Sequence, residues 1–233
     1  MSAGFDRYQS SYADEVERAI AFAGTDAAFF TELKAADLVA LASRRFGASG
    51  DVRALDFGCG TGALDTLVAP KLGAVTGIDV SSGLLEVAAA ENPGVEYRHY
   101  EGGAIPYPDD SFDLAFASCV LHHIEPADRA AAMRELGRVL RPGGIVAIYE
   151  HNPLNPLTRL AVSRCEFDDG VELLPRSETA GLLARAGLTS VESRYIVFFP
   201  WRGGAFRALE RGLARLPLGA QYVVAAVKVG STP

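Results

Sequence analysis

The amino-acid sequence predicts an α/β fold in which a mostly parallel sheet carries helices on both faces. From residue 52 to residue 150, apolar runs typical of buried strands alternate with stretches of helical periodicity. Such alternation is typical of parallel strands joined by right-handed crossovers. A glycine-rich loop follows the first apolar run, and an acidic residue lies at or near the end of each of the first two. These features together favour a ligand site at the carboxyl ends of the strands.

The first apolar run and the loop after it are the centre of this prediction. Val52 to Phe57 is expected to form a buried strand, and a helix is expected from Ala63 to Leu72. Between them lies Gly58-Cys59-Gly60-Thr61-Gly62, whose glycines let a ligand approach the backbone closely. The second run, Val75 to Ile78, is closed by Asp79, about 20 residues past the loop, where such folds place a ribose-binding carboxylate. The sequence therefore predicts a nucleotide-type site.

The charge beside the loop bears on which nucleotide binds. Gly58, Gly60 and Ala63 satisfy the dinucleotide fingerprint G-x-G-x-x-G/A, so NAD is one candidate. Asp56 disfavours NAD, because a carboxylate at the strand end would repel the pyrophosphate that a dinucleotide brings to the helix N-terminus. S-adenosylmethionine carries an ammonium and a sulfonium and has no phosphate, which suits Asp56 and Asp79. The alternative without a ligand is a tight turn between strand and helix with a capping acid.

Five short motifs follow one another between about residue 50 and residue 152. They are Leu55-Asp56-Phe57-Gly58-Cys59-Gly60-Thr61-Gly62, Gly77-Ile78-Asp79-Val80-Ser81, Ile105-Pro106-Tyr107-Pro108-Asp109, Phe112-Asp113-Leu114 with Leu121-His122-His123, and Leu140-Arg141-Pro142-Gly143-Gly144. In order and spacing this set resembles the class I S-adenosylmethionine-dependent methyltransferases. The resemblance implies a Rossmann-like seven-stranded sheet with an antiparallel last strand and an N-terminal helical lid. It also implies S-adenosylmethionine as cofactor, bound by Asp56, Gly58, Cys59, Gly60, Asp79, Val80, Glu101, Gly102, Ser118 and Tyr8.

Size, charge and cysteine content limit the class of protein further. The 233 residues suffice for one α/β domain with an added arm, and a net charge of −7 disfavours nucleic acid as a partner. The three cysteines show no C-x-x-C spacing, so neither zinc nor a disulfide framework is expected, and a reduced cytoplasmic chain is the simplest interpretation. The N-terminus lacks a signal-peptide pattern, and no apolar run approaches the roughly 18 residues of a membrane span. No stable membrane insertion is therefore expected.

Residues 1–50 are expected to form an N-terminal helical arm or lid. Phe5, Tyr8 and Tyr12 fall on one face of a helix. By analogy with the family, this face walls the active site, with a tyrosine hydroxyl on the methionine carboxylate; alternatively it packs on the sheet edge. A longer helix is expected from Asp26 to Phe46, packed on the sheet.

Residues 51–150 are expected to form the cofactor-binding core. Glu101 and Gly102 follow the third strand, where the family places an acid against the adenine amino group; a solvated loop acid is the alternative. On the helix after the fourth strand, the charged residues, Arg129 among them, are predicted to face outward. The expected elements are strands at Val95–His99, Asp113–Ser118 and Ile145–Tyr149, a helix at Pro126–Leu140 and a turn at Arg141–Gly144.

Residues 151–233 complete the same domain, with an insertion on the substrate side and a final β-hairpin. Residues 151–176 begin as a loop too rich in proline for regular structure, and such insertions often carry specificity. A helix opening at Ser177 and two strands, Val191–Phe199 and Tyr222–Val229, follow. Between the strands, Trp201–Pro217 has an apolar and a basic stripe. It is either an amphipathic connecting helix or lid, or a surface for an anionic membrane or a lipid-linked substrate.

Methyl transfer from a sulfonium requires alignment and, where needed, removal of a proton from the acceptor. His122 and His123 follow the fourth strand beside the expected methyl group, and an imidazole suits the role of general base. The same histidines also occur in the family merely as lining of the cofactor pocket; His151 and Glu150 compete for the role of base. No cluster with metal-ligand spacing is present in the sequence.

The sequence thus predicts an enzyme that moves a methyl group from S-adenosylmethionine to an oxygen or nitrogen of a small organic acceptor. One alternative is a methyltransferase for a peptide or lipid-linked substrate, held by residues 151–176 and 201–217. The other is a non-catalytic module that binds S-adenosylmethionine. The identity of the acceptor and the oligomeric state are left open by the sequence.

Overall fold

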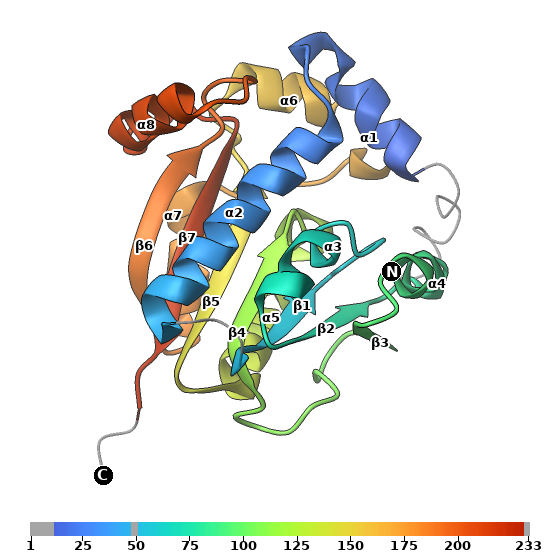
Figure 1. The fold of residues 1–233 in the computed structure, drawn as a ribbon, viewed down its shortest axis with the longest axis vertical. Helices are drawn as coiled ribbons and strands as arrows, with labels where there is room; N and C mark the ends of the chain where they lie inside the picture. Colours follow the sequence, from blue (N-terminus) through green and yellow to red (C-terminus); the bar gives the residue numbers. More distant parts are fainter. Residues whose placement is uncertain (1–11, 48–50, 231–233) are drawn as a thin grey trace.

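A computed structural model describes residues 12–47 and 51–230 of the chain, and the described part folds around one seven-stranded sheet (Figure 1). The strand order is β3-β2-β1-β4-β5-β7-β6, and β7 is antiparallel to both of its neighbours while the other pairs are parallel. The predicted fold class is therefore confirmed. The strands are β1 (Arg53–Phe57), β2 (Ala74–Asp79), β3 (Glu96–His99), β4 (Phe112–Ser118), β5 (Leu140–His151), β6 (Leu188–Ile196) and β7 (Gln221–Lys228).

Helices cover both faces of the sheet, as Figure 1 shows for α2 in front of the strands and α5 behind them. The α-helices are α1 (Tyr12–Ile20), α2 (Ala27–Phe46), α3 (Asp65–Val68), α4 (Ser82–Glu91), α5 (Pro126–Val139), α6 (Pro156–Val162), α7 (Arg176–Arg185) and α8 (Gly204–Leu213). Among the described residues, four single-turn 3₁₀ helices accompany them: η3 (Ala21–Ala23), η5 (Ala69–Lys71), η6 (Leu121–His123) and η7 (Glu166–Asp168). Each face has its own apolar core, one with Leu38 of α2 and the other with Met133 of α5. Burying both faces is what a parallel sheet requires.

The long helix predicted from Asp26 to Phe46 is confirmed as α2. Asp26 caps its N-terminus, because the carboxylate accepts a hydrogen bond from the backbone N–H of Phe29 at 2.8 Å. Leu38 and Leu41 face the sheet and are buried. Arg202, just before α8, pairs with Asp26 and so ties the C-terminal part of the chain to α2.

Three local predictions are wrong. The helix expected from Ala63 to Leu72 is reduced to α3 and η5, because Pro70 lacks the N–H that a continuing α-helix needs. The turn expected at Arg141–Gly144 belongs to β5, whose pairing with β4 shifts register between Phe112 and Leu114 and so absorbs the glycines as an irregularity. The loop expected over residues 151–176 contains α6, capped by Asn155 and opened by a proline in its first turn.

The sheet topology fixes where a ligand can sit. The strand order reverses between β1 and β4, and the crevice at such a point lies outside the carboxyl ends of the strands. In Figure 1, α1, α6 and α8 lie together at this end of the sheet. Across the described residues, the helices are all too short or too polar to traverse a lipid bilayer.

Candidate active site

A cavity of about 970 Å³ opens at the carboxyl ends of the central strands. Its floor comes from the loop after β1, one side from the residues after β2 and β3, and the other from η6 and the start of α5. Residues 169–172, which follow η7, close the far end. Lining residues that the argument uses are Gly58, Gly60, Asp79, Val80, Glu101, Gly102, Ser118, Cys119, His122 and His123.

The glycine-rich loop is held in a strained path that only glycine tolerates. Gly58 has a φ of 77°, and a Cβ built there would lie 2.6 Å from Cγ2 of Val120. The backbone N–H groups of Gly58 and Cys59 both donate to the carbonyl of Ile78, which ties the loop to the end of β2. The glycine at position 58 therefore both permits the turn and allows η6 to approach the loop.

Asp79 holds this loop and faces the cavity. Its Oδ2 accepts a hydrogen bond from the N–H of Gly60 at 2.8 Å, and its Oδ1 accepts one from the N–H of Ser81 at 2.9 Å. Burial raises the pKa of Asp79, although these backbone donors oppose the rise. The carboxylate thus stands at the end of β2, where a ribose hydroxyl can reach its remaining lone pairs.

Asp56 is placed differently from the expectation. It is 2% exposed, does not line the cavity within the described chain, and shares a buried site with Asp65, which is fully buried. Burial and the neighbouring Asp65 raise the pKa of Asp56 well above its usual value, and burial raises that of Asp65 to about 6. The nearest cation, Lys34, opposes the rise at Asp56 and donates to Ser118 at 2.6 Å. The carboxyl of Asp56 therefore lies behind the residues that line the cavity.

The structure brings most of the predicted cofactor residues to one cavity. Gly58, Gly60, Asp79, Val80, Glu101, Gly102 and Ser118 line it. Cys59 belongs to the same loop but lies outside the lining, like Asp56. Tyr8 lies outside the described residues.

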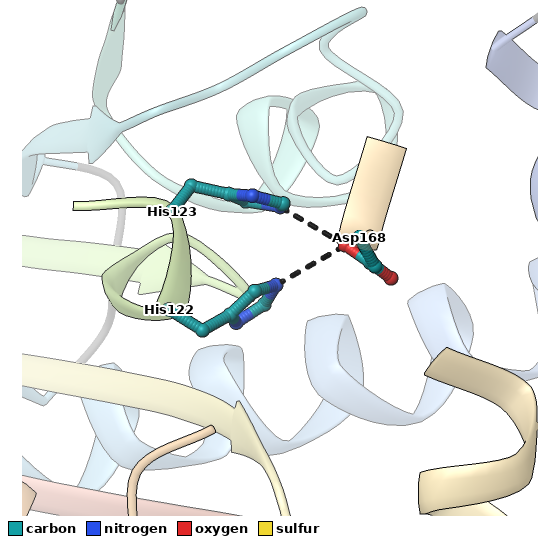
Figure 2. A group of neighbouring side chains, drawn as sticks. All are labelled: His122, His123 and Asp168. Carbon is teal, nitrogen blue, oxygen red and sulfur yellow. Dashed lines mark ion pairs between the residues drawn. The ribbon is translucent and has the colours of Figure 1, made fainter. Parts of the chain in front are cut away.

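A group of histidines and carboxylates from η6, β5 and η7 lies at the cavity, and Figure 2 shows His122, His123 and Asp168 of this group. Nδ1 of His122 lies 2.6 Å from Oε2 of Glu150, and the other oxygen of Glu150 accepts hydrogen bonds from the N–H groups of Val120 and Leu121. Both histidines point toward Asp168 on η7: its Oδ1 lies 3.5 Å from Nε2 of His122 and 3.2 Å from Nε2 of His123. Glu150 at the end of β5 therefore orients η6 through both its backbone and a side chain.

The buried members of this group perturb one another. Burial disfavours the charged form of His122, but the Glu150 and Asp168 carboxylates outweigh it and raise its pKa to about 10. Burial opposes ionisation of Glu150 as well, but the neighbouring His122 and, to a lesser extent, His151 lower the pKa of Glu150 to about 2. Burial dominates at His123, whose pKa is lowered, and at His151, whose pKa falls to about 4. When no other cation is bound, His122 is thus the histidine of this group that carries a positive charge.

The prediction that Arg129 faces outward is wrong. It is 2% exposed, and its guanidinium donates to the backbone carbonyls of Leu121, Ile124 and Glu172 at 3.0–3.1 Å. Arg129 therefore clamps η6 to the segment that closes the far end of the cavity. Helical periodicity gives no sign of this, because the carbonyls that stabilise the charge belong to distant irregular backbone.

Asp168 is the site residue for which the sequence gives the weakest signal. It lies in the insertion expected to carry specificity, but no motif joins it to the histidines, more than 40 positions earlier in the chain. η6 and η7 place two imidazoles and one carboxylate close together, a grouping that spacing along the chain does not reveal. An acid in an irregular segment after a carboxyl-end strand was the only available signal.

Comparison with known proteins agrees with this geometry. Residues 55–148 match the family described as "Methyltransferase domain". A probable S-adenosylmethionine-dependent methyltransferase of Mycolicibacterium smegmatis is 29% identical over 190 residues, which are 75% of this chain and 70% of that protein. A demethylmenaquinone methyltransferase of Staphylococcus aureus is 39% identical over 105 residues, 42% of either chain.

The fold has close structural counterparts as well. A solved S-adenosylmethionine-dependent methyltransferase of Thermotoga maritima, described as a possible histamine N-methyltransferase, superposes with a TM-score of 0.68 at 21% sequence identity. The match covers 98% of this chain and all of that one. Residues 55–148 thus form a methyltransferase domain, and with the motif loop, the acid after β2 and the cavity at the switch point in place, the chain is a methyltransferase that takes its methyl group from S-adenosylmethionine.

Proposed function

We propose that this enzyme methylates an oxygen or nitrogen atom of a small organic acceptor. The observation that carries the proposal is the continuity of one cavity from the glycine loop, past His123, to residues 169–172. Ligand pockets span roughly 300–1,000 Å³, and the 970 Å³ here stand at the upper end of that range. Such a volume leaves room for a small acceptor beside the cofactor.

The two ends of the cavity have separate tasks in this proposal. Asp79 binds the ribose hydroxyls, Glu101 and Gly102 flank the adenine, and Ser118 lies near the methionine end. The acceptor occupies the end between η6 and residues 169–172. Its nucleophilic atom then approaches the methyl carbon in line with the carbon–sulfur bond, and the enzyme acts chiefly by alignment.

His123 is the stronger candidate for direct contact with the acceptor. Both ring nitrogens of His122 face carboxylates, those of Glu150 and Asp168, so its position is fixed by the protein. His123 lines the cavity with a side chain that is 19% exposed. As the general base it would take the acceptor's proton as the new bond to carbon forms.

A second candidate, an acceptor with a long apolar tail, is favoured by exposed leucines around the start of α6. Leu154 and Leu157, which precede and open α6, are both 60% exposed, and Leu218 is 64% exposed. The side chain of Asn155 donates to the backbone carbonyl of Leu218 at 2.6 Å, which ties the start of α6 to the segment before β7. Exposed apolar side chains suit a substrate with an apolar tail, and the S. aureus relative is named as a demethylmenaquinone methyltransferase.

A methyl-transfer screen separates these readings. The purified chain is incubated with radiolabelled S-adenosylmethionine and with phenols, amines, carboxylic acids and a tailed quinol. Transfer to a small phenol or amine, unchanged in Leu157→Ser, supports the small-acceptor proposal. Transfer confined to the tailed quinol, with a raised KM in Leu157→Ser, supports the second candidate instead. Transfer to none of them, from a chain that binds S-adenosylhomocysteine, contradicts both.

A further inference from the structure

η6 and η7 carry three side chains whose potential metal-ligand atoms lie close together. Both imidazoles of η6 direct Nε2 toward Oδ1 of Asp168 (Figure 2), and the three atoms lie within 4.8 Å of one another. We propose that His122, His123 and Asp168 bind one divalent transition-metal ion, of the kind typified by Zn²⁺, which holds the acceptor's oxygen. The inference rests on the proposed function, because it describes how the acceptor end of that cavity works.

Two of the three distances among these atoms are those of a coordination shell, and the third is no more than 4.8 Å. A metal ion bound by nitrogen and oxygen at about 2.0–2.2 Å holds neighbouring ligand atoms about 3.0–3.5 Å apart. The distances from Oδ1 of Asp168 are 3.2 Å to His123 and 3.5 Å to His122. That oxygen is buried and makes no hydrogen bond of ordinary geometry. It therefore lies in a position that an ion between the three groups would explain.

Glu150 orients His122 as the outer carboxylate of a metal site does. Metal-binding histidines commonly donate their second ring N–H to a carboxylate, which fixes the tautomer and turns the lone pair toward the ion. Here Nδ1 of His122 faces Glu150 at 2.6 Å, so the Nε2 lone pair of the neutral ring points at Asp168. A lone pair and a carboxylate repel each other unless a proton or a metal ion lies between them.

The charges of this group of histidines and carboxylates favour an ion over a single proton. Glu150 is fully buried and Asp168 is 7% exposed, so two carboxylates are removed from water. A proton on His122 would offset one of the two negative charges, whereas a divalent ion offsets both. Arg129 does not perform this task, because it donates to backbone carbonyls and its nearest carboxylate is Glu178 at 3.7 Å.

The ligand set indicates the kind of ion and its action. Two imidazoles and one carboxylate suit Zn²⁺ or Fe²⁺, whereas Mg²⁺ and Ca²⁺ prefer oxygen ligands. Three protein ligands leave a position open toward the cavity that His122 and His123 line. An acceptor hydroxyl bound there loses its proton to solvent more easily, and His123 then serves as a metal ligand in place of the general base. Its oxygen then forms the bond to the methyl carbon as the carbon–sulfur bond breaks, releasing S-adenosylhomocysteine.

Metal binding is tested on the whole chain, dialysed against EDTA and titrated with Zn²⁺ by calorimetry and with Co²⁺ by visible absorption. We expect one equivalent of each and no saturable binding of Mg²⁺. His123→Ala and Asp168→Asn should each weaken Zn²⁺ binding at least about 100-fold, and Glu150→Gln by about 10–100-fold. Asp169→Asn is the matched control: it alters the next carboxylate in the chain, is exposed, and should bind Zn²⁺ like the unaltered protein.

The outcomes separate the inference from the proposed function. Absence of stoichiometric Zn²⁺ binding, or binding unaffected by His123→Ala and Asp168→Asn, overturns the site. Should those variants not fold, X-ray absorption of the zinc-loaded unaltered chain decides, because sulfur in the shell would assign the metal to a cysteine instead. Full methyl transfer by the EDTA-treated enzyme overturns the activating role and leaves the proposed function standing. No transfer with or without Zn²⁺ contradicts the proposed function, whatever the metal binding shows.

Discussion

Replacing Arg129 with methionine removes the clamp between η6 and the far end of the cavity while keeping an unbranched side chain. Three backbone carbonyls, those of Leu121, Ile124 and Glu172, lose a charged donor in a place that water does not reach freely, although that of Leu121 still accepts from the N–H of Ile124. Each hydrogen bond to a charged group contributes about 1.5–3 kcal/mol. Part of the sum is returned, because the guanidinium no longer has to be desolvated. We expect a net loss of about 3–5 kcal/mol in the free energy of unfolding.

Urea denaturation of Arg129→Met measures this loss directly. With a dependence of about 1–3 kcal/mol per molar urea, the midpoint should fall by more than about 1 M. Arg134→Met on the exposed side of the same helix is the control, and should stay within about 0.5 kcal/mol of the unaltered protein. An Arg129→Met chain within about 1 kcal/mol of the unaltered one would show that the three carbonyls find other partners, and would refute the clamp.

Two further predictions concern the carboxylates of the cofactor half. Asp79→Asn should weaken S-adenosylhomocysteine binding by about 1–3 kcal/mol, the loss of a charged hydrogen-bond partner; an unchanged dissociation constant in calorimetry would contradict the placement of the ribose. The pKa of Asp65 in the fold, about 6, exceeds its usual value of 3.8, so the folded state holds the proton more tightly. The stability contributed by the protonated pair of Asp56 and Asp65 is complete below about pH 4 and is lost as pH rises through about 6, on the order of 2–3 kcal/mol. Asp65→Asn should therefore gain stability over the unaltered chain between pH 4 and 7 in urea titrations, and a difference independent of pH would rule the shared buried site out.

The cofactor half of the site was predictable because its parts lie close together in the sequence. Gly58, Gly60 and Asp79 belong to one strand–loop–helix unit and the strand after it, and local pattern fixes each. Parallel pairing of β1 with β2 then brings the loop and the acid to the same edge. Even here the helix predicted over residues 63–72 is too long, because Pro70 lacks the N–H that would continue it.

The acceptor half was not predictable in this way. Asp168 meets His122 and His123 only through the folding of an insertion, and Arg129 is buried only because distant carbonyls accept its hydrogen bonds. Helical periodicity places an arginine outside by default, since an isolated buried charge is costly. Contacts of this kind depend on tertiary packing that neither spacing nor propensity encodes.

This division has a chemical consequence for the enzyme. The cofactor end is built on the sheet itself, with Asp79 fixed by two backbone hydrogen bonds. The proposed acceptor end adjoins residues 169–172, which follow η7; Asp168 of η7 faces the histidines, and Arg129 donates to the carbonyl of Glu172. A substitution in that segment can change the acceptor's surroundings without disturbing a hydrogen bond of the glycine loop. We therefore expect a change of acceptor to depend on the distance between the Asp168 carboxylate and the imidazoles of His122 and His123. That distance decides whether the three groups can hold a cation together.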